Sequence, residues 1–201
     1  VLTVLGIELR GNFLIEKATN ATGQSIITIG MSQVGLDLGG VVVIENGTGL
    51  FVLLADDPTT MGVNEGGVAG TISADVTLNI PGVTFTGNFG VSVNTSGTSQ
   101  ATSTTLAGET LSFNLPAGPY LRVEGIGVEL GIGGVVLSGD FAFEQIVTDD
   151  KGNADPADDE KEIRILMNNV ALDLGGDVLR IYNGTGALVV YADDAATNTV
   201  N

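Results

Sequence analysis

Apolar and polar side chains alternate along this chain in runs of about ten residues. Within the segment 83–93, one parity is occupied by Val83, Phe85, Gly87, Phe89, Val91 and Val93. Strict alternation over this length predicts a β-strand with one face directed at a core. The segments 7–15 and 135–143 show the same alternation, with Gly11 and Gly139 in the place of Gly87. Each of these strands therefore carries one glycine on its inward face, where a bend or a close backbone approach is expected.

The three alternating segments belong to a repeated phrase, which reads Gly-x-x-x-x-Gly-Asn/Asp-Phe and occupies residues 6–13, 82–89 and 134–141. A second phrase follows each copy, and its apolar parity slips by one residue partway along. The slip lies between Ile29 and Val34 in the first copy. It predicts a β-bulge or a sharp bend, and the closing Gly-Gly pair predicts a turn. Asn46-Gly47 and Asn183-Gly184 each lie between apolar runs and are predicted to be type I′ hairpin turns.

Residues 1–128 are interpreted as one full repeat unit, and residues 129–201 as the first half of the next. Both ends of the chain fall in mid-pattern, as expected for a piece of a longer array or for a protomer that continues into another chain. The alternative is a stand-alone domain with an internal duplication. No segment shows helical periodicity, so we expect an all-β fold. The favoured architecture is an elongated, β-solenoid-like stack of antiparallel strands, and the alternative is a series of tandem β-sandwiches. Segments of unequal length, 94–107 and 148–161 among them, are expected to be surface loops.

The composition excludes several classes of function. The chain has 24 acidic and 7 basic side chains, a formal charge of −17, and no His or Cys. Nucleic acid is an unlikely partner because binding phosphates requires clustered Lys and Arg, and no apolar run reaches the ~20 residues of a membrane helix, so membrane insertion is not expected. We do not expect an enzyme, since the recurring acids Glu16 and Glu144 should face outward, and a residue repeated in an array is a poor candidate for a unique active site.

Calcium is the only cofactor for which the sequence offers ligands. In the acidic segment 148–160, four oxygen-bearing side chains stand at positions 1, 5, 7 and 12 of a loop like that of an EF-hand, although Lys151 and Ala154 depart from its pattern. Two pairs of acids recur at one phase of the repeat and form a second candidate. The candidate metal ligands are Asp149, Asn153, Asp155, Glu160, Asp56, Asp57, Asp193 and Asp194. Exposed loop carboxylates without an ion are the competing interpretation.

Three stretches, residues 134–145, 115–125 and 183–188, resemble the long tandem repeats of giant secreted or surface proteins of bacteria. These proteins are adhesin-like, and some carry RTX-type calcium modules elsewhere. The resemblance implies an extracellular or cell-surface location and a structural role. The chain lacks the Gly-Gly-x-Gly-x-Asp nonapeptides of an RTX calcium roll, so calcium dependence is not implied.

The leading hypothesis is therefore a structural segment of an extracellular stalk or filament. Its partners would be neighbouring copies of the same repeat, joined end to end by β-strand pairing. The alternative is an adhesin module that binds calcium or a glycan surface through the segments 94–107 and 148–161. The four Asn-x-Ser/Thr sequons, at Asn20, Asn46, Asn94 and Asn183, are compatible with glycosylation but do not require it.

Overall fold

The structure is a computed structural model and describes residues 2–4, 7–21, 23–56, 66–148, 160–175 and 178–191. Within these ranges the chain contains strands and turns and no helix, which confirms the predicted all-β class. The twelve strands are β1 (Leu2–Val4), β2 (Ile7–Thr19), β3 (Ser25–Leu38), β4 (Val42–Leu54), β5 (Gly67–Ile80), β6 (Val83–Asn94), β7 (Gln100–Leu106), β8 (Glu109–Leu115), β9 (Tyr120–Ile132), β10 (Val135–Thr148), β11 (Glu160–Asp173) and β12 (Arg180–Tyr191).

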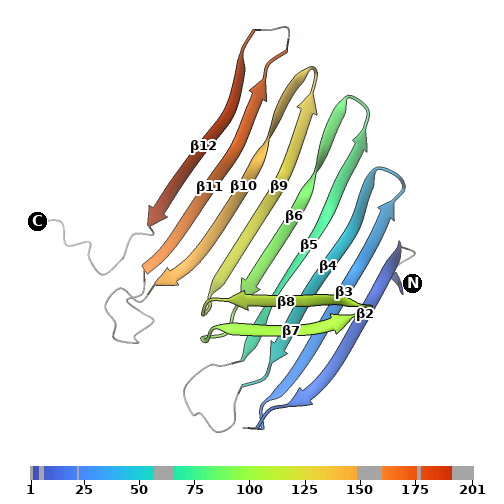
Figure 1. Cartoon of the computed structure of the whole chain (residues 1–201), viewed down its shortest axis with the longest axis vertical. Coiled ribbons are helices and arrows are strands. Elements are labelled where there is room, and N and C mark those ends of the chain that lie inside the picture. Colours follow the sequence, from blue (N-terminus) through green and yellow to red (C-terminus); the bar gives the residue numbers. More distant parts are fainter. Residues whose placement is uncertain are drawn as a thin grey trace, which may run out of the picture.

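Ten of the strands form one open sheet, in the order β1-β2-β3-β4-β5-β6-β9-β10-β11-β12 (Figure 1). Every neighbouring pair is antiparallel, and each strand pairs with its neighbours in the sequence except where β7 and β8 intervene between β6 and β9. The sheet runs through residue 128, inside β9, without interruption. The antiparallel, all-β part of the predicted architecture is thus confirmed, whereas stacking into a solenoid stays a prediction.

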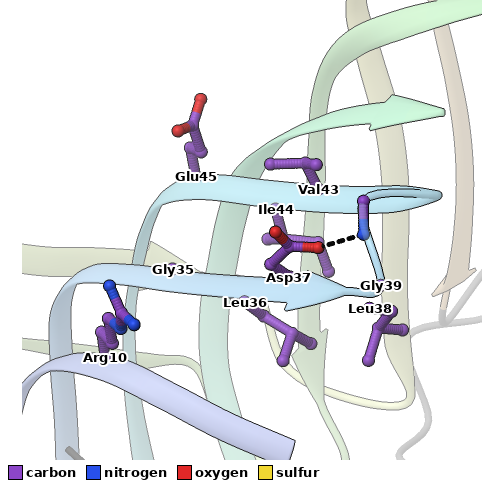
Figure 2. A pocket seen from close by; sticks show the side chains of 10 residues that line it. Arg10, Gly35, Leu36, Asp37, Leu38, Gly39, Val43, Ile44 and Glu45 are labelled. Atoms are coloured by element: carbon purple, nitrogen blue, oxygen red, sulfur yellow. Dashed lines mark hydrogen bonds between the residues drawn. The ribbon is translucent and has the colours of Figure 1, made fainter. Parts of the chain in front are cut away.

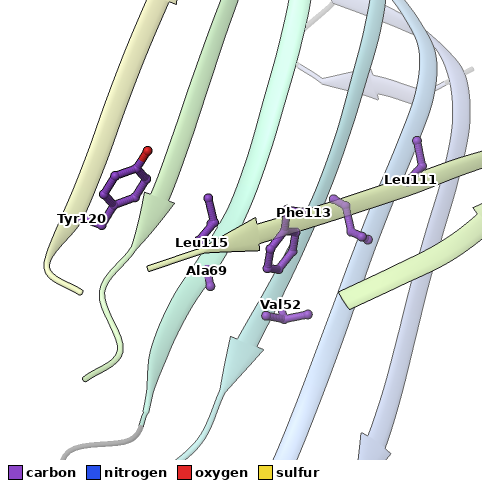
Figure 3. Close-up of a cluster of buried hydrophobic side chains, with 7 residues drawn as sticks. Val52, Ala69, Leu111, Phe113, Leu115 and Tyr120 are labelled. Carbon is purple, nitrogen blue, oxygen red and sulfur yellow. The ribbon is translucent and has the colours of Figure 1, made fainter. Parts of the chain in front are cut away.

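The two remaining strands form a hairpin that crosses one face of the sheet (Figure 1). Alternate residues of β8 point at the sheet and become buried, and the hairpin contacts β2, β3, β4, β5 and β6. The buried apolar cluster consists of Leu50, Val52, Ala69, Leu111, Phe113, Leu115 and Tyr120 (Figure 3). The segment 94–107 is therefore not the surface loop that we predicted, since its second half is strand β7.

The base of the hairpin is held by one buried amide. Asn94 is fully buried, and its Nδ2 donates to the carbonyl oxygens of Thr98 and Pro116 at 2.8 and 2.7 Å. Its Oδ1 accepts from the backbone N–H and the hydroxyl of Ser96, at 2.9 and 2.7 Å. With both donors and the acceptor used, the side chain fixes the path by which the chain leaves the sheet.

The predicted turns are confirmed at the Gly-Gly pairs that join β3 to β4 and β9 to β10. All four glycines have positive φ, and Gly39 and Gly40 lie at 67° and 71°. The prediction for the Asn-Gly pairs is wrong, because both lie inside strands, β4 and β12. Asn46 and Asn183 do adopt positive φ, 54° in each, but they form bulges within long strands and not the ends of short ones.

The predicted bulge in the second phrase is confirmed in all three copies, and it explains the glycine of the first phrase. A Cβ on Gly11, Gly87 or Gly139 would lie 3.0 to 3.1 Å from the Cα of a valine on the neighbouring strand. These valines are Val34, Val128 and Val170, and each register shift falls beside them. The glycine therefore leaves room for the valine that the bulge pushes toward it.

The Asn or Asp that follows this glycine forms hydrogen bonds near the bulge, a role that the sequence pattern did not predict. Asn88 and Asn46 donate to the two carboxylate oxygens of Asp75 at 2.8 Å each, and Asn169 donates to Asp140 at 2.8 Å. Asn46 and Asn169 are the residues with positive φ at the bulges. The repeated phrase thus combines a glycine that admits the valine with a polar side chain near the bulge.

Candidate assembly interface

The described acidic side chains of the sheet strands gather on one face of the sheet. Cross-strand partners point to the same side, so the registers assign each strand residue to a face. The face crossed by the hairpin, here called the polar face, carries Asp37, Glu45, Asp75, Glu124, Glu129, Asp140, Glu144, Glu162 and Asp173. Where side chains are described, no Asp or Glu of the sheet strands lies on the other face.

We call that other face the apolar face. One continuous row of directly paired residues crosses nine strands of it, and reads Phe13, Met31, Gly49, Ile72, Val91, Val123, Phe143, Ile165 and Leu188. No described segment covers this row. Its exposed side chains range from 36% at Val91 to 53% at Leu188, while Met31, Ile72 and Ile165 are half-buried and Gly49 is buried. The alternation that predicted an inward face therefore leads to an apolar surface that the described part of the chain leaves open.

The edge strand β12 is the second unpaired feature. It matches β4 at a shift of 137 residues, so Val189 corresponds to Val52. Val52 is 5% exposed because β5 pairs alongside β4 and the hairpin covers it, whereas Val189 is 41% exposed. Along the same strand Tyr182, Leu188, Val190 and Tyr191 are also exposed. The second copy of the strand thus lacks, among the described residues, the neighbours that bury the first.

The opposite edge is β2, which is partly covered by β1. The pairing of Leu2–Val4 with Ile7–Leu9 repeats the pairing of the last three residues of β9 with β10, at a shift of 128 residues. Beyond Leu9, no described strand pairs with the outer side of β2. In the interior copy the equivalent side of β10 is paired along β9 from Gln145 to Val135. At both outer edges of the described sheet, a strand therefore lacks the neighbouring strand that pairs with its equivalent in the interior of the sheet.

Strands β9, β10 and β11 hold a charged cluster on the polar face. Glu144 accepts a hydrogen bond from the Tyr120 hydroxyl at 3.0 Å and lies 3.5 Å from Arg122 and from Arg164. Its side chain is only 15% exposed, so the expectation that it faces solvent is wrong. Burial, reinforced by the hydrogen bond to Glu144, raises the pKa of Tyr120 to about 12. Paired carboxylates and guanidinium groups of this kind fix strand positions and present no unpaired acid or base for catalysis.

Two carboxylates of the bulge regions are held ionised by amide donors. The amides of Asn46 and then Asn88 lower the pKa of Asp75 below its usual value. The backbone N–H of Gly127, and then the Asn169 amide, lower the pKa of Asp140 in the same way. The hydrogen bonds stabilise the charged form of each carboxylate and tie it to the residues of the bulge.

A hollow of about 680 Å³ lies at the end of strands β2, β3 and β4 (Figure 2). Arg10, Asp37 and Glu45 border it, together with apolar strand residues. The Asp37 carboxylate accepts from the backbone N–H of Gly40, and Asp173 accepts from Gly175 at the equivalent turn. Asp37 therefore has a turn-capping role that Asp173 repeats in the second copy.

The predicted metal ligands lie mostly outside the described residues. This applies to Asp57, Asp149, Asn153, Asp155, Asp193 and Asp194. Glu160 is the first residue of β11, and Asp56 accepts a hydrogen bond from the backbone N–H of Gly66 at 2.9 Å. Within the part of the chain that the structure describes, no three acidic side chains come together in a way that could hold a metal ion. The calcium site stays a prediction.

The structure shows the surroundings of the sequon asparagines. Asn94 is fully buried and its amide is bonded to two carbonyl oxygens, so the folded chain cannot carry a glycan there. The Asn46 amide is exposed but bonded to Asp75, and the Asn20 amide donates to Gln24 at 3.0 Å.

Comparison with protein-family models, with curated proteins and with solved structures found no match to this chain. The described residues contain no helix with the length and apolar character that crossing a membrane requires.

Proposed function

We propose that this chain is a structural repeat segment of an extracellular stalk or filament, which propagates by strand pairing between the edge of one copy and the edge of the next. The observation that carries the proposal is the contrast between Val52 and Val189, which are equivalent in sequence and differ in exposure from 5% to 41%. The apolar side chains on both faces of β12 are those of an interior strand, although β12 is an edge.

Natural edge strands are usually short, charged or bulged so that they do not pair with other chains. β12 spans 12 residues, and from Gly184 to Tyr191 it contains no charged side chain and no proline. Its free backbone groups and its apolar side chains suit the addition of a further strand. The outer side of β2 beyond Leu9 also has no strand paired with it among the described residues, so each copy offers two edges. Pairing of one edge with another generates an open-ended series.

The mass distribution of the purified chain tests this proposal, measured by sedimentation over a range of concentrations and by electron microscopy. We expect species larger than a dimer that lengthen as concentration rises. Val189→Lys places a charge where the next strand must pack, and it should remove those species. Ser103→Lys, on the exposed side of the hairpin, is the matched control and should leave them unchanged.

Two results would contradict the proposal. One is a wild-type chain that never exceeds a dimer at any concentration. The other is a Val189→Lys variant that retains its β-sheet circular dichroism and still forms the longer species. The extracellular location needs a separate test, which is immunolabelling of intact cells that produce the protein.

A further inference from the structure

We infer that the apolar face is the contact surface of a two-layered assembly, in which a second copy of the chain packs its own apolar face against the first. The inference concerns the face of the sheet and not its edges, and it does not depend on the edge pairing proposed above. Area, charge and shape of the described strands support it in turn.

The area is sufficient for a stable dimer. Nine strands of 12 to 14 residues, at about 4.8 Å between strands and about 3.3 Å per residue, make a face of roughly 1,800 Å². A standard specific interface buries only about 800 Å² on each partner.

The charge distribution favours a second copy over a charged partner. A chain with a formal charge of −17 resists self-association wherever its carboxylates would meet. On the apolar face the only described charges are Lys17 and Lys161, each near the end of its strand, while the carboxylates of the sheet strands lie on the polar face. Packing two apolar faces together therefore keeps the acidic groups of both copies on the outside.

The shape of the face suits sheet-on-sheet packing. Aromatic and aliphatic side chains lie down over neighbouring glycines, so that a Cβ on Gly70 would clash with the ring of Phe51 and one on Gly125 would lie 3.1 Å from the ring of Phe89. The rings of Phe85 and Phe89 stack with centroids 5.4 Å apart. A face smoothed in this way can approach a second sheet at the usual separation of about 10 Å. Because the same patch serves both copies, the assembly closes as a two-fold dimer.

A lipid surface is the other environment that could accept an apolar face. The charge of −17 opposes approach to an anionic bilayer. If the apolar face is protected only when lipid is present, lipid is the partner and the inference is overturned.

The absence of cysteine from the chain makes the test direct, because one introduced thiol reports one position. Val91→Cys places a thiol on the apolar face of β6, and Thr84→Cys places one on the polar face of the same strand. Both are made in the Val189→Lys background, so that edge pairing is blocked. The rate of thiol alkylation is then measured as protein concentration rises.

We expect alkylation of Val91→Cys to slow by about fivefold once the chain concentration exceeds the dimer dissociation constant by about tenfold. Alkylation of Thr84→Cys should change by less than about twofold over the same range. In the same background, Val91→Lys should weaken dimerisation by about 100-fold or more, because an unpaired charge would be buried. Thr84→Lys is the matched control and should leave the dimer intact. Circular dichroism confirms that each variant is folded.

The inference is overturned if the Val91→Cys thiol reacts at one rate at all concentrations in a folded protein. It is also overturned if protection appears only after phosphatidylcholine vesicles are added, because lipid would then be the partner. Loss of long species in Val189→Lys with the dimer retained supports both proposals. Val91→Lys is also made with Val189 unchanged. If this variant still forms the long species, and the variant that carries both substitutions no longer dimerises, face pairing and edge pairing are separate interactions.

Discussion

The close approach between glycine and valine, repeated in all three copies, can be tested by comparing alanine substitutions at glycines. A Cβ on Gly87 would lie 3.1 Å from both the Cα and a methyl group of Val128, and the φ of Gly87 is not in the region that favours glycine. Gly87→Ala therefore introduces overpacking alone. Overpacking costs about 1–3 kcal/mol, and the lower entropy of an unfolded alanine offsets about 0.5 kcal/mol. We expect a net loss of about 1–2 kcal/mol in the free energy of unfolding.

Gly139 has almost the same surroundings but a φ of +151°, so Gly139→Ala adds backbone strain to the overpacking. Strain of this kind costs about 1–3 kcal/mol, which raises the expected loss to about 2–4 kcal/mol. Gly108→Ala isolates the strain, since its φ is +85° with nothing within 4 Å of the new Cβ. Gly131→Ala is the control, because its Cβ would make an ordinary contact of 3.4 Å with Thr84 and it has no positive φ.

Urea unfolding followed by circular dichroism measures the four variants, with midpoints compared at a shared slope. The expected order of destabilisation is Gly139→Ala, then Gly87→Ala, then Gly131→Ala, with Gly139→Ala close to the sum of Gly87→Ala and Gly108→Ala. If Gly87→Ala loses no more stability than Gly131→Ala, contact with Val128 does not explain why position 87 is a glycine. The structural explanation of the repeated phrase would then be incorrect.

Three further predictions concern the hairpin, the charged cluster and calcium. Phe113→Ala should lower the free energy of unfolding by about 3–4 kcal/mol because a buried ring is lost, whereas Ser112→Ala on the exposed side of β8 should change it by less than about 0.5 kcal/mol; urea unfolding measures both. Because the pKa of Tyr120 is raised to about 12, its contribution to stability is complete below pH ~10 and is lost as pH rises toward 12, by up to about 2.7 kcal/mol. Tyr120→Phe should flatten that part of the pH profile of the melting temperature, and a profile identical to that of the wild type would contradict the assignment. Calcium at a structural site should raise the melting temperature in proportion to ln(1 + [Ca²⁺]/Kd) and chelator should reverse the rise, whereas identical curves would remove the predicted calcium site.

The strands, the bulges of the second phrase and the Gly-Gly turns could be predicted from the sequence because each depends on local spacing. The error at Asn46-Gly47 has an equally local cause. The Asn-Gly pair does provide the positive φ that we expected, but β3 bulges at Gln33 opposite it, so the two strands stay paired on both sides. The residues after Gly47 lead into a continuous apolar run, Leu50–Leu54, which suits a new strand after a turn as well as one strand that continues.

The hairpin was missed because its Ser and Thr content is typical of loops. The alternation of Leu111, Phe113 and Leu115 predicts a strand, but nothing in it specifies docking across the sheet. The sequence could not show, for a related reason, that the described segments leave the predicted inward face uncovered. Alternation shows that a face is apolar, whereas covering it requires a partner layer, which depends on packing between distant segments or separate chains.

The meander order of the sheet has a mechanical consequence. Because β1 and β12 lie at opposite edges of the sheet, tension applied through these two strands would act perpendicular to the strands. The strands would then unzip one after another, and only a few hydrogen bonds would carry the load at any moment. Such peeling requires little force for each step but releases a long stretch of chain. The segment would therefore lengthen gradually under load, as an energy-absorbing link does, unless lateral neighbours carried part of the tension.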